Sequence, residues 1–281
     1  MEISLKQKQK IFIGSGEASL IEKKVCIYSL RKNCNLTNLE IFCFNGTHDT
    51  LENESGDVIK KINLDIHIKY ENNTEFTFYK FLVPDLCDHE GNALFIDSDI
   101  LCLGDLNELY QINLKENAVL AKKSAYLKDE WGTSVMLFNC NKYNLNLIEC
   151  FNDIKNKKYS KEDLLMFTKQ FRDFHNINIQ PYDDKWNSFD FYDENTRLLH
   201  YTNLHHQPWK FHGNQYGKIW FKYFFECVKQ NIITKEDIQK SIDRSYIRSD
   251  IMDGNDLKLS KFLMNNLRYF KNVIRNLLKG K

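Results

Sequence analysis

Short apolar runs alternate with polar segments in the first part of the chain. The runs KIFIG (residues 10–14) and LEIFCF (residues 39–44) predict strands, because each is short and rich in branched or aromatic side chains. Between them, residues 18–34 carry apolar side chains among lysines and arginines, which predicts a helix. A strand, a helix and a second strand form the opening βαβ unit of a nucleotide-binding α/β sheet.

The loop after the first predicted strand contains Gly14, Ser15 and Gly16. In a βαβ unit this loop lies at the carboxyl edge of the sheet, where ligands bind. Glycines there let a ligand approach the backbone closely, so these three residues are candidates for contact with a bound nucleotide. The spacing does not match the G-x-G-x-x-G fingerprint, and two ordinary turn glycines are the alternative interpretation.

Further elements follow this unit. A polar stretch at residues 45–73 precedes EFTFYKFLVPDL (residues 75–86), which predicts a helix. Residues 119–122 and 134–139 predict further strands, and residues 142–172 predict mostly polar helices.

The segment ALFIDSDILC, residues 93–102, carries the clearest chemical signal. A buried strand that ends in Asp97 and Asp99 is unusual, because desolvated carboxylates are costly unless they are paired or bind a metal. Hard oxygen ligands suit Mg2+ or Mn2+, and such ions most often serve phosphate chemistry. Directly afterwards, Asp105 is placed to cap a short helix and Glu108 to close a capping box.

The twenty residues FIDSDILCLGDLNELYQINL (95–114) resemble glycosyltransferase family 8, in which an apolar strand ends in Asp-x-Asp and Gly-Asp-Leu-x-x-Leu follows. The resemblance implies a GT-A fold, which is an α/β Rossmann-like domain with a mixed central sheet. It also implies a UDP-sugar donor and a divalent cation, usually Mn2+, with Mg2+ as the alternative. In this resemblance Asp97 and Asp99 bind the cation at the catalytic centre, and Ser98 lies beside the donor.

A second block, LLHYTNLHHQPWK (residues 198–210), resembles the family's late motif His-Tyr-x-Gly-x-x-Lys-Pro-Trp, with a spacing one residue longer. The resemblance makes His200 the third protein ligand of the cation. His205 and His206 are the alternative histidines. Two carboxylates, one imidazole and two diphosphate oxygens form a ligand set that favours Mn2+ over Mg2+.

The same block departs from the family at its diphosphate-binding lysine. Gln207 stands at that position, so the positive charge would come from Lys210, from His206 or from the cation itself. The resemblance places these three residues beside the diphosphate of the donor.

Two further departures concern the donor sugar. Lys80 stands where the family has an arginine, and a lysine lacks the planar fork that grips two oxygens. It either contacts the donor sugar or a phosphate, or it is a surface lysine beside a core Phe81. Gly132 falls near the family's asparagine; with Thr133 and Ser134 it would line the donor sugar through backbone or hydroxyl groups.

The family's Asp-Gln-Asp acceptor motif is missing between residues 155 and 186. The following segment WNSFDFY, residues 186–192, is similar to a bacterial subgroup of the family that has Trp-Asn-Ser there. In that interpretation Asn187 and Asp190 approach the substrate.

Composition and charge limit the kinds of partner and cellular compartment that we expect. The chain has 281 residues, and a formal net charge of +1 argues against bulk nucleic-acid binding. Eight cysteines are scattered through apolar stretches without a C-x-x-C pair, which predicts reduced core residues. We find no signal peptide and no apolar run of the ~18 residues that a membrane span needs, so we expect a cytoplasmic protein.

The C-terminal stretch 257–279 is amphipathic with a basic face. Such a helix suits an anionic membrane surface, which would place the protein peripherally on the inner face of the membrane through residues 257–281. Packing of the apolar stripe on the catalytic domain is the alternative. We therefore expect a GT-A catalytic domain at residues 1–235 and a helical C-terminal extension at residues 236–281.

The resemblance implies transfer of a hexose, galactose or glucose, from a UDP-sugar to a hydroxyl of a glycan or lipid-linked glycan with retention of configuration, as in lipopolysaccharide or other surface-glycan biosynthesis. No side chain stands out as a covalent nucleophile, which favours a same-face mechanism in which a diphosphate oxygen takes the acceptor proton. One alternative is a catalytically silent sugar-nucleotide-binding protein. Another is a phosphohydrolase with Asp97 as nucleophile, although Ile100 and Leu101 follow the acidic pair where such enzymes have Gly-Thr.

Overall fold

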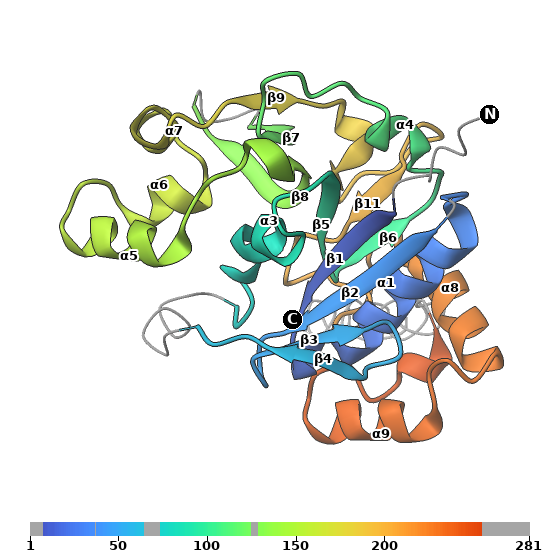
Figure 1. The fold of residues 1–281 in the computed structure, drawn as a ribbon. Coiled ribbons are helices and arrows are strands. Elements are labelled where there is room, and N and C mark those ends of the chain that lie inside the picture. Colours follow the sequence, from blue (N-terminus) through green and yellow to red (C-terminus); the bar gives the residue numbers. More distant parts are fainter. Residues whose placement is uncertain (1–7, 37, 65–73, 125–128, 255–281) are drawn as a thin grey trace, which may run out of the picture. The chain divides into compact units, whose positions relative to one another are not determined.

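The computed structural model describes residues 8–36, 38–64, 74–124 and 129–254 (Figure 1). The chain divides between Tyr201 and Thr202 into two compact units. The functional boundary expected at residue 235 stays a prediction. The amphipathic stretch 257–279 lies outside the described residues.

An eight-stranded sheet runs through the described part of the first unit, in the order β4-β3-β2-β1-β5-β8-β7-β9. Its strands are β1 Gln9–Ser15, β2 Leu39–Asn45, β3 Thr50–Asn53, β4 Val58–Lys61, β5 Asn92–Asp97, β7 Val119–Lys123, β8 Trp131–Asn139 and β9 Ile179–Pro181. Strand β1 pairs in parallel with β2 and β5, whereas β8 runs antiparallel to β5 and β7. The predicted α/β class with a mixed central sheet is confirmed.

A second, three-stranded sheet has the order β10-β11-β6. Its strands are β6 Ile100–Cys102, β10 Ser188–Phe189 and β11 Leu198–His200. Strand β11 pairs antiparallel with β6 and parallel with β10. Since β5 ends at Asp97 and β6 begins at Ile100, the acidic pair lies where the chain passes from one sheet to the other.

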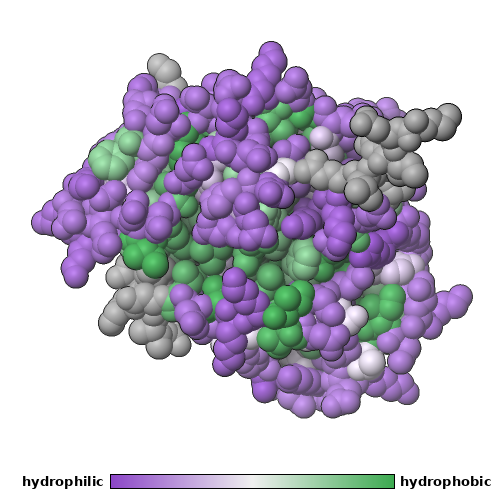
Figure 2. Space-filling view, in the orientation of Figure 1, coloured by the Kyte–Doolittle hydropathy of each residue, from purple (hydrophilic) through white to green (hydrophobic). Residues whose placement is uncertain are grey.

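Within the first unit, helices cover both faces of the large sheet (Figure 1). In the first unit these are α1 Leu20–Asn33, α3 Val83–Leu86, α4 Asn107–Tyr110, α5 Leu147–Lys155, α6 Lys161–Leu165 and α7 Lys169–His175. Successive side chains of each strand point to opposite faces of the sheet and pack into two apolar cores. In β1, Phe12 faces one core, and Ile11 and Ile13 face the other together with Cys26 and Leu30 of α1. The surface shown in Figure 2 is accordingly mostly hydrophilic, with apolar side chains gathered near the middle of the view.

The predicted opening unit is confirmed, because β1, α1 and β2 follow one another with the expected limits within two residues. The polar stretch after β2 is not only a loop. It contains the hairpin of β3 and β4, whose outer strand is fully exposed at Val58–Lys61. A strand with neither face buried has no alternating pattern from which it could be predicted.

The helix predicted at residues 75–86 is only partly present. The chain forms a 3-10 turn at Tyr79–Leu82 and then the single turn α3, with Pro84 at its start. Proline has no N–H to donate to a preceding turn, so a continuous helix through this position is disfavoured.

The capping box predicted for Asp105 and Glu108 is wrong. Helix α4 begins at Asn107, and the Asp105 carboxylate accepts from the Asn107 amide at 3.2 Å. The Glu108 carboxylate instead forms an ion pair with Lys185 at 2.8 Å.

Residues 142–172 do contain helices α5 to α7, as predicted, but their inner side is not polar. Leu164, Phe167 and Phe171 are fully buried in the core. A capping box between Ser160 and Asp163 starts α6. All eight cysteines are free thiols, seven of them buried, which agrees with the prediction of reduced core residues.

The second unit contains helices α8 Gly217–Lys229 and α9 Lys235–Asp243 in its described part. Trp209 packs on Trp220 with ring centroids 5.3 Å apart, and Trp220 stacks on Phe224. Among the described residues, no helix combines the length and apolar character that crossing a membrane requires.

Candidate active site

The acidic pair lies at the carboxyl end of β5. Asp97 is in register with Gly14 of β1, and the Ser98 amide donates to the Gly14 carbonyl at 3.1 Å. His200 comes to the same place because β11 pairs with β6, which puts His200 opposite Ile100. Both carboxylates and the imidazole are therefore positioned by strand pairing rather than by a flexible loop.

Asp97, Asp99 and His200 offer ligand atoms that all lie within 4.8 Å of one another. The His200 Nε2 atom is 2.9 Å from Oδ1 of Asp99. Among the described residues, no other group of three or more such side chains converges in this way. Two carboxylates and one imidazole form a donor set that Mn2+ accepts, so the residues present fit the predicted cation.

Burial and mutual charge shift the pKa values of Asp97, His200 and Lys80 in this group. Burial raises the pKa of Asp97 to about 6, and the negative charge of Asp99 adds to this, whereas Lys80 and His200 oppose it. Burial lowers the pKa of His200, but the charge and hydrogen bond of Asp99 outweigh it, so the net shift is upward. Burial also lowers the pKa of Lys80, against the attraction of Asp97.

Lys80 is buried, so the surface-lysine alternative is wrong. Its Nζ atom donates to the hydroxyl and the carbonyl of Thr133 at 2.8 and 3.3 Å. Its side chain is only 8% exposed and lines the same cavity as Asp97. The Lys80 ammonium and the Asp97 carboxylate attract one another, which partly offsets the burial of each charge.

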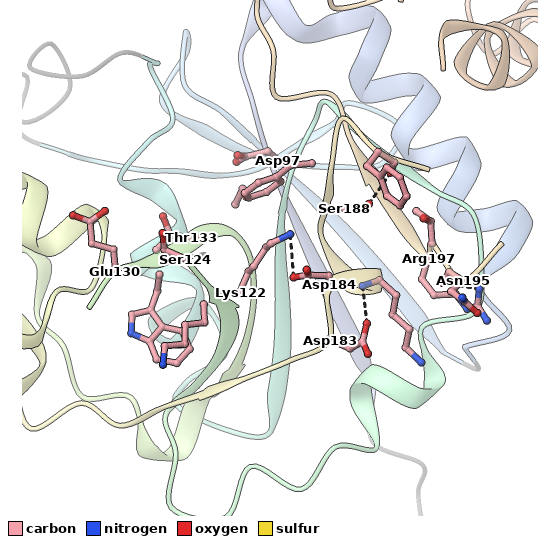
Figure 3. A pocket seen from close by; sticks show the side chains of 18 of the residues that line it. Asp97, Lys122, Ser124, Glu130, Thr133, Asp183, Asp184, Ser188, Asn195 and Arg197 are labelled. Atoms are coloured by element: carbon pink, nitrogen blue, oxygen red, sulfur yellow. Dashed lines mark hydrogen bonds and ion pairs between the residues drawn. The ribbon is translucent and has the colours of Figure 1, made fainter. Parts of the chain in front are cut away.

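A cavity of about 970 Å³ opens beside Asp97 (Figure 3). Gly132, Thr133 and Ser134 lie in its wall, and their contact with a donor sugar stays a prediction. Phe189 also lines the cavity, with its ring centroid 4.3 Å from the Lys122 ammonium. The remaining lining comes from the following residues: Lys80, Lys123, Ser124, Glu130, Trp131, Met166, Asp183, Asp184, Lys185, Ser188, Phe191, Asp193, Asn195, Thr196 and Arg197.

Asn187 and Asp190 were predicted to approach the substrate, and neither is among the residues that line the cavity. Asn187 is completely buried, and its Oδ1 atom lies 3.1 Å from Nδ1 of His200. The Asp190 amide donates to the His200 carbonyl at 2.9 Å. Both residues thus support His200, and direct contact with substrate stays a prediction.

The loop after β1 is covered by the chain itself. A Cβ atom on Gly14 would lie 2.8 Å from the rings of Phe76 and Phe95, and one on Gly16 would lie 2.9 Å from the Glu75 carboxylate. The Ser15 hydroxyl donates to the Phe44 carbonyl at 2.6 Å. The glycines are therefore needed for internal packing, and their contact with a nucleotide stays a prediction.

His206, Gln207 and Lys210 belong to the second unit. Gln207 is buried, whereas His206 and Lys210 are exposed. Their predicted roles at the diphosphate stay predictions.

Two contributors were missed from the sequence. Lys122 and Phe189 line the cavity, and the Phe189 ring lies against the His200 ring with centroids 5.5 Å apart. Lys122 is the last residue of the strand predicted at residues 119–122, and a lysine at the end of an apolar run is a usable signal for a residue at the edge of a sheet. Phe189 carries no such signal, because this chain has 20 Phe.

Comparison with known proteins fits this geometry. The family described as "Glycosyl transferase family 8" matches residues 11–161, which is more than half of the chain. The chain belongs to glycosyltransferase family 8. The phosphohydrolase interpretation of Asp97 is thereby wrong, and the GT-A fold expected from the acidic pair is confirmed.

Two curated relatives share part of the sequence. The glycosyltransferase GlyE of Streptococcus pneumoniae serotype 4 is 23% identical over 221 residues, covering 68% of this chain and 52% of GlyE. Protein CDI of Arabidopsis thaliana is 32% identical over 83 residues, covering 24% of this chain and 32% of that protein. The chain thus spans about half or less of the length of these relatives.

Two solved structures share the fold. The galactosyltransferase LgtC, in complex with donor and acceptor sugar analogs, superimposes with a TM-score of 0.61 at 12% identity, covering 83% of this chain and 99% of LgtC. GlyE of S. pneumoniae TIGR4 gives a TM-score of 0.55 at 19% identity, covering 80% of this chain and 64% of GlyE.

Proposed function

We propose that this protein is a metal-dependent retaining glycosyltransferase that moves a hexose, galactose or glucose, from a UDP-sugar to a glycan hydroxyl. The observation that carries the proposal is the group of Asp97, Asp99 and His200 beside a cavity large enough for a sugar. Surface-glycan assembly, with contact to an anionic membrane through residues 257–281, is the setting that we propose on sequence grounds alone.

In this proposal the acidic side chains and His200 bind the cation, and a lysine adds positive charge beside them. Asp97, Asp99 and His200 would hold Mn2+ or Mg2+. When bound, the cation supplies positive charge for the leaving diphosphate. Lys80 stands beside Asp97 and adds a second positive charge at the inner end of the cavity. Thr133 accepts the Lys80 hydrogen bond, which fixes the ammonium in place before substrate arrives.

The aromatic part of the cavity lining suits an acceptor sugar. Phe189 and Phe191 are 42% and 55% exposed, and aromatic faces of this kind bind the apolar faces of sugars. The charges of the lining cancel, which favours an uncharged acceptor sugar. The basic residues are Lys80, Lys122, Lys123, Lys185 and Arg197, and the acidic residues are Asp97, Glu130, Asp183, Asp184 and Asp193.

Replacing Phe189 with alanine is expected to raise the KM for the acceptor about three- to tenfold, because one aromatic contact contributes roughly 0.5–1.5 kcal/mol. Because the Phe189 ring also contacts the His200 ring, with centroids 5.5 Å apart, hydrolysis of the donor without acceptor is measured alongside to separate the two effects. The matched control is Phe174→Ala, which removes a similarly exposed ring outside the cavity lining. An unchanged acceptor KM in Phe189→Ala would remove this ring from the acceptor site.

The proposed function is tested by UDP release from a panel of UDP-sugars, first with Mn2+ and then with EDTA. We expect slow hydrolysis of one UDP-sugar with Mn2+ and none with EDTA. Mn2+-dependent binding of UDP without any turnover would instead favour the catalytically silent sugar-nucleotide-binding protein. If the protein neither releases UDP nor binds it, both the transferase and the silent binding protein are contradicted.

A further inference from the structure

Lys122 lies where the pairing of two strands of the large sheet is irregular. Ala121 of β7 pairs with Met136 of β8, but the next residue, Lys122, pairs with Gly132, so the register of the two strands shifts between them. Irregularities of this kind beside active sites re-aim a side chain. The Lys122 side chain is only 13% exposed and lines the cavity.

The Lys122 ammonium has three partners, and all of them belong to residues 184–189. Its Nζ atom donates to the Asn187 carbonyl at 2.8 Å and lies 3.2 Å from the Asp184 carboxylate (Figure 3). It also stands 4.3 Å from the ring centroid of Phe189. An ammonium has three N–H groups, and the carbonyl, the carboxylate and the ring account for all three. The contacts of Lys122 in the described part of the chain therefore commit it to this segment.

The segment 184–189 carries two side chains that contact the His200 ring. Oδ1 of the buried Asn187 lies 3.1 Å from Nδ1 of His200, and the Phe189 ring lies edge-on to the imidazole with centroids 5.5 Å apart. His200 itself is held by the pairing of β11 with β6. The segment has less support of its own, because β10 consists of Ser188 and Phe189 only. Lys122 thus ties a short strand of the small sheet to β7 of the large sheet.

We propose that Lys122 is a positioning residue, which clamps residues 184–189 to the large sheet and fixes the Phe189 ring for the acceptor sugar. Attraction between the ammonium and the ring restricts the ring before the sugar arrives, so less side-chain entropy is lost on binding. The benefit for the acceptor rests on the proposed function, whereas the clamp is a property of the protein alone.

Three variants of Lys122 and one control test this clamp. Lys122→Met keeps the length of the side chain and removes its charge and donors, whereas Lys122→Arg keeps both. Lys122→Gln keeps a donor for the Asn187 carbonyl and loses the charge, and it replaces Lys122→Met should the methionine disturb folding. The matched control is Lys158→Met, because the Lys158 ammonium likewise pairs with a carboxylate, that of Asp153 at 2.7 Å, and lies 5.4 Å from a ring centroid, that of Phe174, outside the cavity lining.

The first readout is amide hydrogen exchange of the ligand-free full-length protein, followed by mass spectrometry on peptides that cover residues 184–189. We expect exchange at least about threefold faster in Lys122→Met or its replacement, because the segment opens locally once the clamp is lost. Lys122→Arg and Lys158→Met should exchange like the wild type. Wild-type exchange in Lys122→Met would overturn the proposal.

The second readout is a double-mutant cycle on sugar transfer that combines Lys122→Met with Phe189→Leu. With the phenylalanine present, Lys122→Met should raise the acceptor KM about five- to thirtyfold, the range for a partly desolvated contact between a cation and a ring. The donor KM should change less, because strand pairing holds the cation ligands independently of Lys122. With Phe189→Leu present, Lys122→Met should raise the acceptor KM less than about twofold further. Lys122→Arg should restore the acceptor KM.

An equal rise of the acceptor KM with and without the Phe189 ring would overturn the proposal, since Lys122 would then act without that ring. A general structural defect would instead raise the donor KM as much as the acceptor KM, which would also contradict a positioning role. A wild-type protein that transfers no sugar would count against the proposed function, whereas hydrogen exchange, measured without donor, cation or acceptor, still decides whether Lys122 clamps the segment.

Discussion

Replacing Asp99 with asparagine is expected to abolish metal-dependent sugar transfer, lowering kcat/KM by at least about 10³-fold, which corresponds to several kcal/mol of lost charge stabilisation. Asparagine keeps the size of the side chain but removes the charge that completes the ligand group with Asp97 and His200. The measurement is UDP release with Mn2+, together with Mn2+ affinity in the absence of donor. Folding should be retained.

The control for this experiment is Asp173→Asn. Asp173 is an exposed carboxylate on α7 that pairs with Lys169 and does not line the cavity. Its replacement should leave turnover and Mn2+ affinity unchanged. If Asp99→Asn keeps turnover near the wild-type level while Mn2+ affinity is also unchanged, Asp99 does not belong to the site.

Replacing Asp97 with asparagine is expected to stabilise the metal-free protein at neutral pH while it destroys activity. Burial raises the pKa of Asp97 from 3.8 to about 6, so the folded state holds a proton that the unfolded chain has already released. The free energy of unfolding therefore falls as the pH rises from about 4 to about 6, and above that window the buried charge costs on the order of 3 kcal/mol. Asparagine removes this cost.

The measurement is thermal unfolding of chelated wild-type and variant protein at several pH values. At neutral pH the variant should unfold on the order of 5 °C higher, and the difference should vanish below about pH 4, where Asp97 is protonated in both states. Asp105→Asn gives a control of opposite sign. Burial tends to raise the pKa of Asp105, but hydrogen bonds from Asn107 and neighbouring amides hold it below its usual value, so losing that charge should destabilise the protein at neutral pH. An Asp97→Asn variant that is no more stable than wild type would contradict the proposed burial cost.

The local sequence pattern was sufficient to predict an element where one continuous segment contained all the residues that define it. An apolar run that ends in two carboxylates can adopt few stable arrangements, because buried carboxylates must be paired or bind a metal. The strand, the acidic pair and the next strand follow in the predicted order in β5 and β6. The opening βαβ unit is equally local, since burial on a parallel sheet leaves short apolar runs separated by a helix. The hairpin of β3 and β4 shows the limit of this logic, because an exposed strand leaves no such pattern.

Partners that are distant in sequence were decided by packing. Lys80 resembles any surface lysine in the sequence, and only the fold turns it inward onto Thr133 beside Asp97. Asn187 was expected at the substrate, but the pairing of β10 with β11 places it behind His200. The sequence around a short polar side chain does not indicate which neighbour it hydrogen-bonds.

The sequence by itself determined the family, the sheet that opens the domain and the two carboxylates at the end of β5, because each depends on residues that are close together along the chain. Only the tertiary structure decided which histidine joins them, that Lys80 is buried and that the Asn187 side chain lies against His200. Those properties depend on desolvation and on the geometry between strands, and neither is encoded in local residue order.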